Sequence, residues 1–500
     1  MAHVPIESLS QDIERLHAVL VAWHHHIQSQ VAQQALNLTD IRTLARLFRE
    51  HATHAPDLVV QETGSRLVVW IDGLVDSQEL TTFLKSDSPD TLDNIGHSSR
   101  PVQLWSRVIS GVWRGQTAIV TAKKPGAVLI DFAKPPHRDI ESPVTEQTIR
   151  GPQDAFVELE NVKIAQIRER LATPDLVVER LSIGLRFPTC CDLIYCESLA
   201  SPEVITRVRD RLRSLTLDSA TNATRLGSLI RDHPWALFPT VRYSERVDWV
   251  ALQLQSGKVA LSIQGDPFVL TVPATLSDFY RTSEDYNAAW YDASFIRIIR
   301  LLAWAFGVML PGWYIALTEV NPDLISPTLF NIIAGSHTGL PFTPFVEVVV
   351  MILVIEVLRE AAVRLPKVLA TTLGTVGAIV VGTAVVKAGF VSPQIIVLMT
   401  FTALSLFSVP TYELLATWRF MSWGVLVGAF VLGIYGVMLV TLAMSVELVS
   451  LTSFGTPYLS PLSPWRPKDW ENFTWRVPWR ALRRRLTEGR ATDLRWTDDA

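Results

Sequence analysis

Long apolar segments in the second half of the chain limit its possible folds more than any other feature. They are 301–317, 368–386, 394–409 and 420–446, and several are long enough for a helix to cross a bilayer core, which takes about 20 residues. A further stretch, 341–367, places Glu347 and Glu356 in an otherwise apolar run. A carboxylate at the centre of a membrane helix costs at least ~2.5 kcal/mol, so such residues face a bundle interior or a water-filled path. The sequence therefore predicts an integral membrane protein with two acids held inside its helical part.

The basic residues predict how this helical part crosses the membrane. No Lys or Arg lies between Arg300 and Arg359, and basic residues favour the inner side of a membrane. We therefore expect 301–319 and 344–358 to form a hairpin, followed by three more spans at the remaining apolar segments. This count leaves the C-terminal tail outside, whereas the excess of basic residues after residue 465 favours the inner side.

One apolar segment is therefore expected not to span. The segment that begins at Pro344 is the candidate, because it is short, proline-flanked and interrupted by Glu347. The alternative keeps this segment as a span, because removing it would leave the basic cluster at 359–367 outside or at membrane depth.

The first half of the chain contains a duplicated unit. Segments 66–84 and 191–212 share one order: an apolar run with an aromatic residue, an acid, a turn and an amphipathic helix. Each is followed by apolar stretches around a glycine, Gly115 or Gly257, which we interpret as β-hairpins. The predicted fold class is thus an α/β soluble half, with two related subdomains in tandem, plus an α-helical multi-pass transmembrane domain.

The expected boundaries follow from this interpretation. They are a helical N-terminal segment at 1–60, α/β subdomains at 61–150 and 176–290, a helical linker at 151–175, a transmembrane domain at 291–447 and a basic, Trp-rich tail at 448–500. The N-terminus has no basic region followed by an apolar run, so we expect no cleaved signal peptide and a cytoplasmic soluble half.

The soluble half carries no strong sign of an enzyme. It lacks the motifs of a phosphate loop, a zinc protease and a nucleophile elbow. Asp72 and Glu197 follow predicted strands and could be catalytic, but an acid that caps a turn is the favoured interpretation. The neighbours His24, His25 and His26 cannot all serve one metal, because adjacent helix residues point about 100° apart. We expect no enzymatic activity, no cofactor and no nucleic-acid partner.

The cysteines suggest no covalent framework. Cys190, Cys191 and Cys196 are too few and too clustered for a set of disulfides or a four-ligand zinc site. We expect them to be small buried residues of a strand.

Several ordered blocks run nearly the length of the chain. They are WIDGLVD (70–76), TEQTIRGPQDAFVE (145–158), IRERL (167–171), LFP (237–239), SERVD (244–248), SEDY (283–286), LPGWYIAL (310–317), PFTPFVE (341–347), EVLREAAVRLPK (356–367), VGAIVVG (376–382) and PYLSPL (457–462). In this order they resemble the GerA family of spore germination proteins, and specifically the A-type subunit of spore germinant receptors. The linker residues that match the family motif are Arg150, Gly151, Pro152, Phe156 and Asn161.

The match has departures. The block at 150–156 lacks a basic residue and a glycine of the family pattern, Thr343 replaces a proline, and Thr383 replaces a glutamine. These differences leave open whether the chain is a nutrient-responsive subunit or a related paralogue of the ion-release apparatus. The resemblance implies a spore inner-membrane protein that acts with a transporter-like B subunit and a lipoprotein C subunit. It also implies a homo-oligomer that forms a ligand-gated path for cation release.

The charged residues of the stretch 341–367 are the candidates for an ion path or a gate. Glu356 with Arg359, and Glu360 with Arg364, stand at helical spacings that allow pairing, which alternatively only fixes a helix end. Glu347 has no cation within one helical turn, so it must pair with another segment, be protonated or meet water. It is the favoured residue for ion contact, since a ring of carboxylates attracts cations; a protonated carboxyl packed against a neighbouring helix is the alternative.

Small residues at four-residue intervals predict close helix packing. They are Gly374, Ala378 and Gly382 in one segment and Gly424 and Gly428 in another. The five Trp residues of the basic tail indicate contact with a membrane interface or a partner. The leading hypothesis is a non-enzymatic signalling and ion-conducting subunit. A secondary transporter with Glu347 as its proton or cation site, and a membrane-tethered enzyme, are the alternatives.

Overall fold

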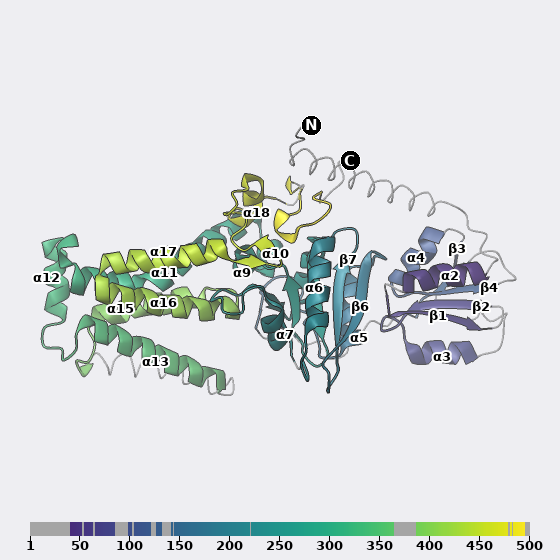
Figure 1. Ribbon diagram of the computed structural model, residues 1–500, viewed down its shortest axis with the longest axis horizontal. Helices are drawn as coiled ribbons and strands as arrows, with labels where there is room; N and C mark the ends of the chain where they lie inside the picture. The colour runs from purple at the N-terminus through teal and green to yellow at the C-terminus, as the bar shows by residue number, and fades with distance from the viewer. Residues whose placement is uncertain are drawn as a thin grey trace, which may run out of the picture. The chain divides into compact units, whose positions relative to one another are not determined.

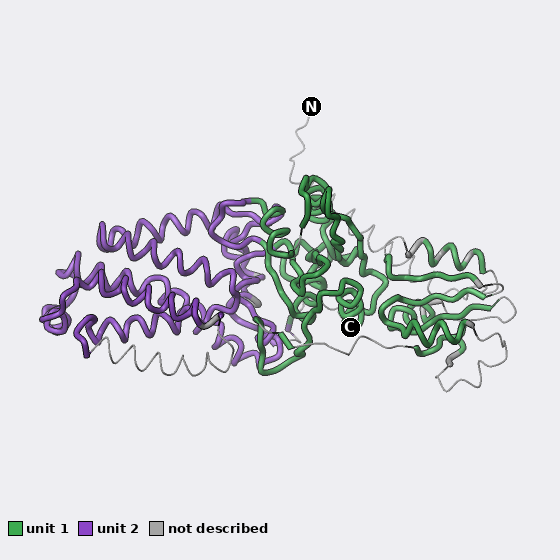
Figure 2. Tube along the Cα trace, turned by 90° about the horizontal axis from the view of Figure 1, so that it is seen from below, with its two compact units in different colours: residues 1–232, 241–273, 482–500 green, residues 233–240, 274–481 purple. Residues whose placement is uncertain are grey.

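The structure is a computed structural model of the chain. It describes residues 41–52, 55–63, 66–85, 99–102, 105–121, 127–132, 142–143, 145–220, 222–364, 387–478, 481–482 and 484–495. The expectations for His24 to His26, for the segment 368–386 and for Gly374, Ala378 and Gly382 lie outside these residues. The chain divides into two compact units (Figure 2): residues 1–232, 241–273 and 482–500 form unit 1, and residues 233–240 and 274–481 form unit 2.

Unit 1 contains two five-stranded antiparallel sheets with the same strand order (Figure 1). The first sheet has the order β1-β2-β4-β5-β3, and the second has the order β6-β7-β9-β10-β8. The strands of the first are β1 (Leu58–Thr63), β2 (Arg66–Ile71), β3 (Ser99–Val102), β4 (Thr117–Thr121) and β5 (Ala127–Ile130). Those of the second are β6 (Leu176–Ile183), β7 (Thr189–Cys196), β8 (Arg242–Ser244), β9 (Val259–Ile263) and β10 (Val269–Val272). The predicted fold class, with its duplication, is confirmed.

Helices cover these sheets. In the first subdomain they are α2 (Ile41–Ala52), α3 (Ser77–Lys85) and α4 (Trp105–Trp113), and in the second α6 (Pro202–Ser214), α7 (Ala223–Ile230) and α8 (Val247–Gln255). The linker helix α5 (Glu160–Arg170) lies between the subdomains in sequence. Leu67 and Val69 of β2 pack on the side of α2 and α4, while Val68 packs on the side of α3. Because both faces are covered, these strands are nearly continuous in apolar residues.

The predicted hairpins around Gly115 and Gly257 are wrong. The apolar stretch before each glycine is a helix, α4 or α8, and each glycine starts the turn into the next strand with a φ of 87° or 81°. Short apolar runs fit a buried helix as well as a strand, and residues such as Val108 and Val112, one helical turn apart, share one buried face.

The cysteines lie on β7, as expected. Cys191 and Cys196 are buried and Cys190 is partly buried, and all three thiols are free. Burial raises the pKa of the Cys196 thiol to about 12, so this group stays protonated and unreactive near neutral pH.

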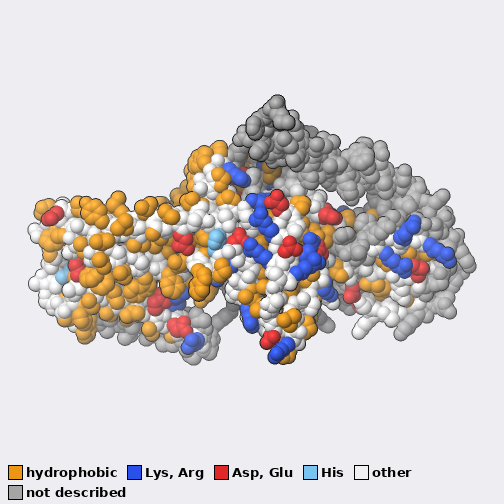
Figure 3. Space-filling view, in the orientation of Figure 1, with side chains coloured by type: hydrophobic (Ala, Val, Ile, Leu, Met, Phe, Trp, Pro, Cys, Tyr) orange, Lys and Arg blue, Asp and Glu red, His pale blue; other side chains and the backbone are white. Residues whose placement is uncertain are grey.

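Unit 2 is predominantly helical. Its long helices are α11 (Trp290–Ile315), α13 (Pro344–Arg364), α15 (Pro393–Phe407), α16 (Tyr412–Leu432) and α17 (Ile434–Ser450), and shorter ones are α9 (Leu276–Tyr280), α10 (Ser283–Asn287), α12 (Pro327–Ser336) and α18 (Trp470–Phe473). A π-helical turn, Ala316–Val320, extends α11. In the described part of the chain, the helices 290–320 and 412–432 are long and apolar enough to cross a membrane. Hydrophobic side chains cover much of the face of this unit seen in Figure 3, Phe401, Val431 and Leu439 being examples of exposed ones.

The expected span 420–446 is wrong, because Gly433 divides it into α16 and α17. Gly433 has a φ of 61°, and the chain reverses there, since Gly428 of α16 faces Gly436 and Val440 of α17. Ile434 N donates a hydrogen bond to Asn321 Oδ1 at 2.9 Å, which fixes the turn against the end of α11.

The extra helix changes the count of crossings from which the side of the tail was expected. After α17, Arg476 donates a hydrogen bond to the carbonyl of Tyr286, just before α11, at 2.9 Å. The helices of unit 2 therefore return to the end at which they start. The segment from Pro344 is a continuous 21-residue helix, but in the described part of the chain it is not one of the two helices that are long and apolar enough to cross a membrane. The side of the tail and the role of this helix as a span stay predictions.

We predict that Gly433→Ala destabilises the protein by about 1–3 kcal/mol, since it forces a side chain into a backbone conformation that only glycine adopts readily. An added Cβ would also meet Asn321 Oδ1 at 1.9 Å. Thermal unfolding of the purified full chain in detergent measures the effect. Gly335→Ala is the matched control, because no atom lies within 4 Å of its added Cβ, and an equal loss in both variants would contradict the prediction.

Candidate functional site

Glu347 is fully buried at the end of unit 2 where α11 ends and α13 begins. Its Oε1 lies 2.9 Å from His337 Nδ1, and its Oε2 accepts a hydrogen bond from Ser392 N at 2.7 Å. The other ring nitrogen of His337 lies 3.1 Å from the Tyr314 hydroxyl. Tyr314, His337, Glu347 and Ser392 form what we call the Glu347 cluster, in which the carboxylate oxygens are held by two other segments.

Local sequence explains why these segments meet. Pro311 lies inside α11, and at Gly312 an added Cβ would meet Val425 of α16 at 2.6 Å, so the glycine permits a close approach. The π-helical turn that follows carries Glu319, whose Oε2 accepts a hydrogen bond from Phe345 N in the first turn of α13, at 2.9 Å. Ser392 is the N-cap of α15, and a helix N-terminus favours a negative charge.

For Glu347 the structure shows one of the alternatives that the sequence left open, which is pairing with another segment. The sequence did not identify the partner residues. The sequence did contain one indication of this partner. His337 is the only histidine after His233, and, like Glu347, it lies between Arg300 and Arg359, where there is no Lys or Arg. Because Glu347 is fully buried, contact with a cation requires a rearrangement that opens the Glu347 cluster.

The other acid of α13 forms a separate charged cluster. Glu356 pairs with Arg359 one turn later and with Arg419 Nη1 of α16 at 3.1 Å. We call Glu356, Arg359 and Arg419 the Glu356 cluster. Glu360 and Arg364 also pair, at 2.5 Å, but both side chains are largely exposed. The structure therefore keeps Glu347 and Glu356 apart, each with different partners.

A third cluster lies at the opposite end of unit 2, where α11 begins. Asp285 Oδ2 lies 2.9 Å from Arg297 Nε and 3.3 Å from Arg300 Nη1. Arg297 is fully buried, and Arg476 donates to the carbonyls of Tyr286 and Ala288 at 2.9 and 2.7 Å. Burial alone would raise the pKa of Asp285, but the two guanidinium groups outweigh it and lower that pKa.

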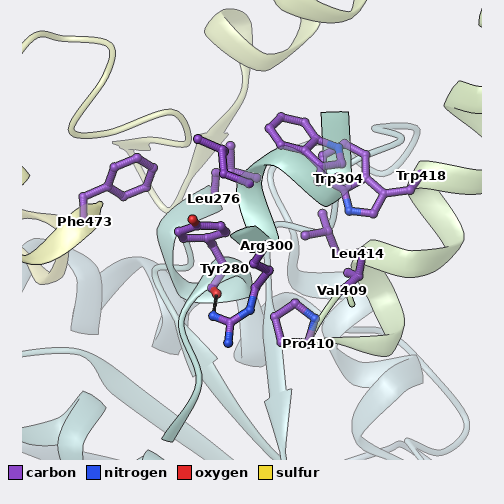
Figure 4. Close-up of a pocket in the computed structure, with 10 residues that line it drawn as sticks. Leu276, Tyr280, Arg300, Trp304, Val409, Pro410, Leu414, Trp418 and Phe473 are labelled. Carbon is purple, nitrogen blue, oxygen red and sulfur yellow. Dashed lines mark hydrogen bonds between the residues drawn. The ribbon is translucent and has the colours of Figure 1, made fainter. Parts of the chain in front are cut away.

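A cavity opens beside this cluster (Figure 4). Its cavity volume is about 30 Å³, and its free space, including the open mouth, is about 390 Å³. The walls are mainly apolar, and Trp304 and Trp418 lie in contact with ring centroids 4.3 Å apart. Among the described residues their indole nitrogens have no acceptor. Arg300 donates to Tyr280 O at 2.8 Å, as drawn in Figure 4. This cavity volume suits about two water molecules rather than an organic ligand.

The linker motif of unit 1 is held by one arginine. Arg246 is buried, donates to Pro152 O at 2.7 Å and pairs with Asp248 at 2.9 Å. Phe156 N donates to Glu245 O at 2.8 Å, and the Phe156 side chain lies in the core of the second subdomain.

The remaining linker residues lie at the surface. Arg150 and Gly151 are exposed, and Gly151 has a φ of 112°. Asn161 Oδ1 accepts a hydrogen bond from Arg180 at 3.2 Å. The linker motif therefore contributes Phe156 to the core of the second subdomain, while Arg150, Gly151 and Asn161 are exposed.

The small residues on α16 lie against α17. An added Cβ at Gly428 would meet Val440 at 2.8 Å, and one at Gly424 would meet it at 3.6 Å. Gly428 thus allows the antiparallel pair of helices to approach closely, whereas a side chain at Gly424 would make only an ordinary van der Waals contact. Among the described residues, no group of three or more His, Cys, Asp or Glu is placed to hold a metal ion.

Comparison with known proteins gives a consistent family. The family model described as Bacillus/Clostridium GerA spore germination protein matches residues 46–488. Spore germination protein B1 of Bacillus subtilis is 32% identical, covering 85% of this chain and 91% of that protein. Spore germination protein GerQA of Bacillus cereus is also 32% identical, covering 90% of this chain and 91% of that protein.

A solved structure was also found. It is the crystal structure of the N-terminal domain of the A subunit of the Bacillus megaterium spore germinant receptor GerK3. It aligns with a TM-score of 0.36 and 23% identity, and the match covers 46% of this chain and 93% of that chain.

We predict that Asp285→Asn destabilises unit 2 by about 3–5 kcal/mol, because it leaves a buried arginine without its charged partner. The lowered pKa of Asp285 means that its contribution is present above the unfolded value of about 3.9 and is lost as the pH falls through the folded value. Thermal unfolding of the full chain between neutral and acidic pH tests both points. The exposed Asp292 supplies the control, Asp292→Asn; a similar loss there would show that the effect is not specific to the buried pair.

We also predict that His337 and Glu347 are energetically coupled. His337→Phe and Glu347→Gln should each destabilise the chain, and the double variant should lose less than the sum, with a coupling of about 0.5–3 kcal/mol. Unfolding of the three variants and the parent gives this double-mutant cycle. Additive losses would show that the contact between the two side chains contributes nothing to stability.

Proposed function

The chain belongs to the GerA family of spore germination proteins, and from that premise we propose that it is an A-type subunit of a spore germinant receptor. Its role is in germination, like that of its relatives. The observation that carries the proposal is the family match over residues 46–488, together with relatives that share about a third of their residues along most of both chains.

We propose that unit 2 lies in the spore inner membrane and that the soluble subdomains are cytoplasmic. Two helices of membrane length, 290–320 and 412–432, support this placement, as do the exposed apolar side chains of the unit, since a soluble surface rarely exposes so large an apolar area. Charge supports the orientation, because no Lys or Arg lies between Arg300 and Arg359. The tail joins the same side, since Arg476 contacts the residues just before α11.

The protein works, on this proposal, as part of a homo-oligomer with a transporter-like B subunit and a lipoprotein C subunit. A nutrient signal shifts the assembly from a closed to an open state, which requires a higher affinity of the signal for the open one. The open state releases cations. The charged residues of α13 are the candidate contacts of this path, and Glu347 is the foremost among them.

The geometry of the Glu347 cluster describes the closed state of this proposal. Glu347 is 0% exposed and both of its oxygens have hydrogen-bond partners, so it offers no oxygen to a passing ion. Opening must separate α13 from His337 or from the N-terminus of α15. A carboxylate released in this way becomes a site that favours cations.

A secondary transporter is the second candidate. The observation in its favour is a buried acid beside an interrupted helix, since α11 contains Pro311 and ends in a π-helical turn, and transporters place coupling ions at such breaks. The two functions differ in coupling. A channel passes ions without a fixed stoichiometry, whereas a carrier moves one substrate with a fixed number of protons or ions.

We predict that Glu347→Gln changes nutrient-triggered cation release by at least about tenfold, the factor that corresponds to ~1.4 kcal/mol in a gating equilibrium. Glutamine keeps the size of the side chain but removes its charge. The measurement is cation flux from liposomes that contain the chain with its B and C subunits. Asp292→Asn, an exposed acid of unit 2 that lies outside α13, is the matched control.

Two outcomes would decide against parts of this proposal. Unchanged release in an assembled Glu347→Gln complex would remove Glu347 from the ion path. Uptake of a substrate in strict proportion to protons would replace the channel by the carrier.

A further inference from the structure

The Glu356 cluster carries more positive than negative charge. Among the described residues, Arg359 and Arg419 both pair with Glu356, whose Oε2 lies 3.1 Å from Arg419 Nη1. Glu360 is the nearest further acid on α13, and it is paired with Arg364 on an exposed surface. Two guanidinium groups and one carboxylate leave a net charge of about +1, because arginine does not lose its proton in proteins.

Part of this charge is withdrawn from solvent. The side chains of Arg359 and Arg419 are 18% and 28% exposed. Arg419 Nε is buried and has no hydrogen-bond partner among the described residues. An unpaired donor of this kind costs free energy unless an acceptor reaches it, so the cluster is incomplete as it stands.

A cavity adjoins these guanidinium groups. It lies between α13, α15 and α16; its cavity volume is about 30 Å³, and its free space, including the open mouth, is about 410 Å³. Glu356, Arg359 and Arg419 line it, and the rest of its wall is largely apolar, with Ile352, Met399 and Leu406 among the lining residues. The cavity itself holds no more than about two water molecules, so a larger group would sit in the mouth, against the arginines.

We propose that Arg359 and Arg419 bind a phosphate-type anion at this mouth, and that the anion is the headgroup of an acidic phospholipid. The paired guanidinium groups match the oxygens of a phosphate. The apolar remainder of the wall suits an acyl chain, which a free phosphate lacks. Basic pockets between membrane helices on the cytoplasmic side bind acidic headgroups in general, and the proposed topology places the C-terminal end of α13 on that side.

The charges of the Glu356 cluster predict whether each substitution weakens or strengthens lipid binding. Arg419→Gln should weaken binding of phosphatidylglycerol by at least about tenfold, because it removes one of two charged donors. Glu356→Gln should strengthen binding, because it removes the only competing carboxylate of the cluster. Arg364→Gln is the matched control, since Arg364 is exposed and pairs with Glu360 on the same helix; it should leave binding unchanged.

The experiment uses the full chain in nanodiscs of phosphatidylcholine with increasing phosphatidylglycerol. Native mass spectrometry counts the lipids that remain bound to each variant, and circular dichroism checks that each variant is folded. A second arm adds inorganic phosphate to the protein in phosphatidylcholine alone and follows thermal unfolding. Protection by phosphate that disappears in Arg419→Gln, without selective retention of phosphatidylglycerol, would assign the site to a free anion and overturn the lipid assignment.

Other results would overturn the site itself. The proposal fails if the parent chain retains phosphatidylglycerol no better than phosphatidylcholine and gains nothing from phosphate. It fails equally if Arg364→Gln weakens binding as much as Arg419→Gln, since surface charge alone would then explain retention. If Glu356→Gln folds but does not strengthen binding, the cluster serves only to join α13 to α16. None of these measurements depends on germination, so they test the lipid site independently of the proposed receptor function.

Discussion

Charged side chains are stable inside an apolar helical unit only where they contact opposite charges or hydrogen-bond partners. The free energy lost when a charged group leaves water is otherwise not compensated by interactions inside the protein. In unit 2 this requirement determines which helices lie together. Glu347 of α13 contacts the loop after α12 and the N-terminus of α15. Glu356 joins α13 to α16 through an ion pair, and Asp285 joins α10 to α11 in the same way. The apolar contacts between these helices are numerous but not directional, whereas each charged contact fixes one register.

Backbone constraints act together with these contacts. The chain reverses at Gly433, which has a positive φ, and the side chain of Asn321 accepts a hydrogen bond from the backbone amide of Ile434 just after the turn. Gly428 and Gly312 allow α16 to lie close to both α17 and α11. Because the reversal adds one helix, the residues after α17 return to the end where α11 begins. The pairing of Arg476 with the carbonyls before α11 is possible only after that return.

The sequence predicted features that depend on local pattern or on charge balance. The duplicated plan was visible because β2 and β7 carry similar apolar runs before similar helices. Glu347 was recognised as an acid inside the unit because it interrupts an apolar run, whereas the side chain of Glu356, the other acid expected inside, is 30% exposed. Features that depend on contacts between distant residues were not predicted. His337 stands in a loop ten residues before Glu347, beyond the reach of a helical turn, and Arg419 is 63 residues from Glu356. The helices before Gly115 and Gly257 were missed because a short apolar run does not distinguish a buried helix from a strand.

The two ends of unit 2 differ in the kind of charge that holds them. At the end where α11 begins, Asp285 meets two arginines, and a guanidinium keeps its charge at every accessible pH. Breaking that contact would leave a buried charge without a partner, so this end resists separation. At the other end Glu347 meets the imidazole of His337 and a backbone amide at a helix N-terminus. Neither of these partners is a guanidinium, so separating them from Glu347 leaves no buried arginine without its partner. The opening proposed above would therefore begin at the end of Glu347, with the end of Asp285 as the fixed base.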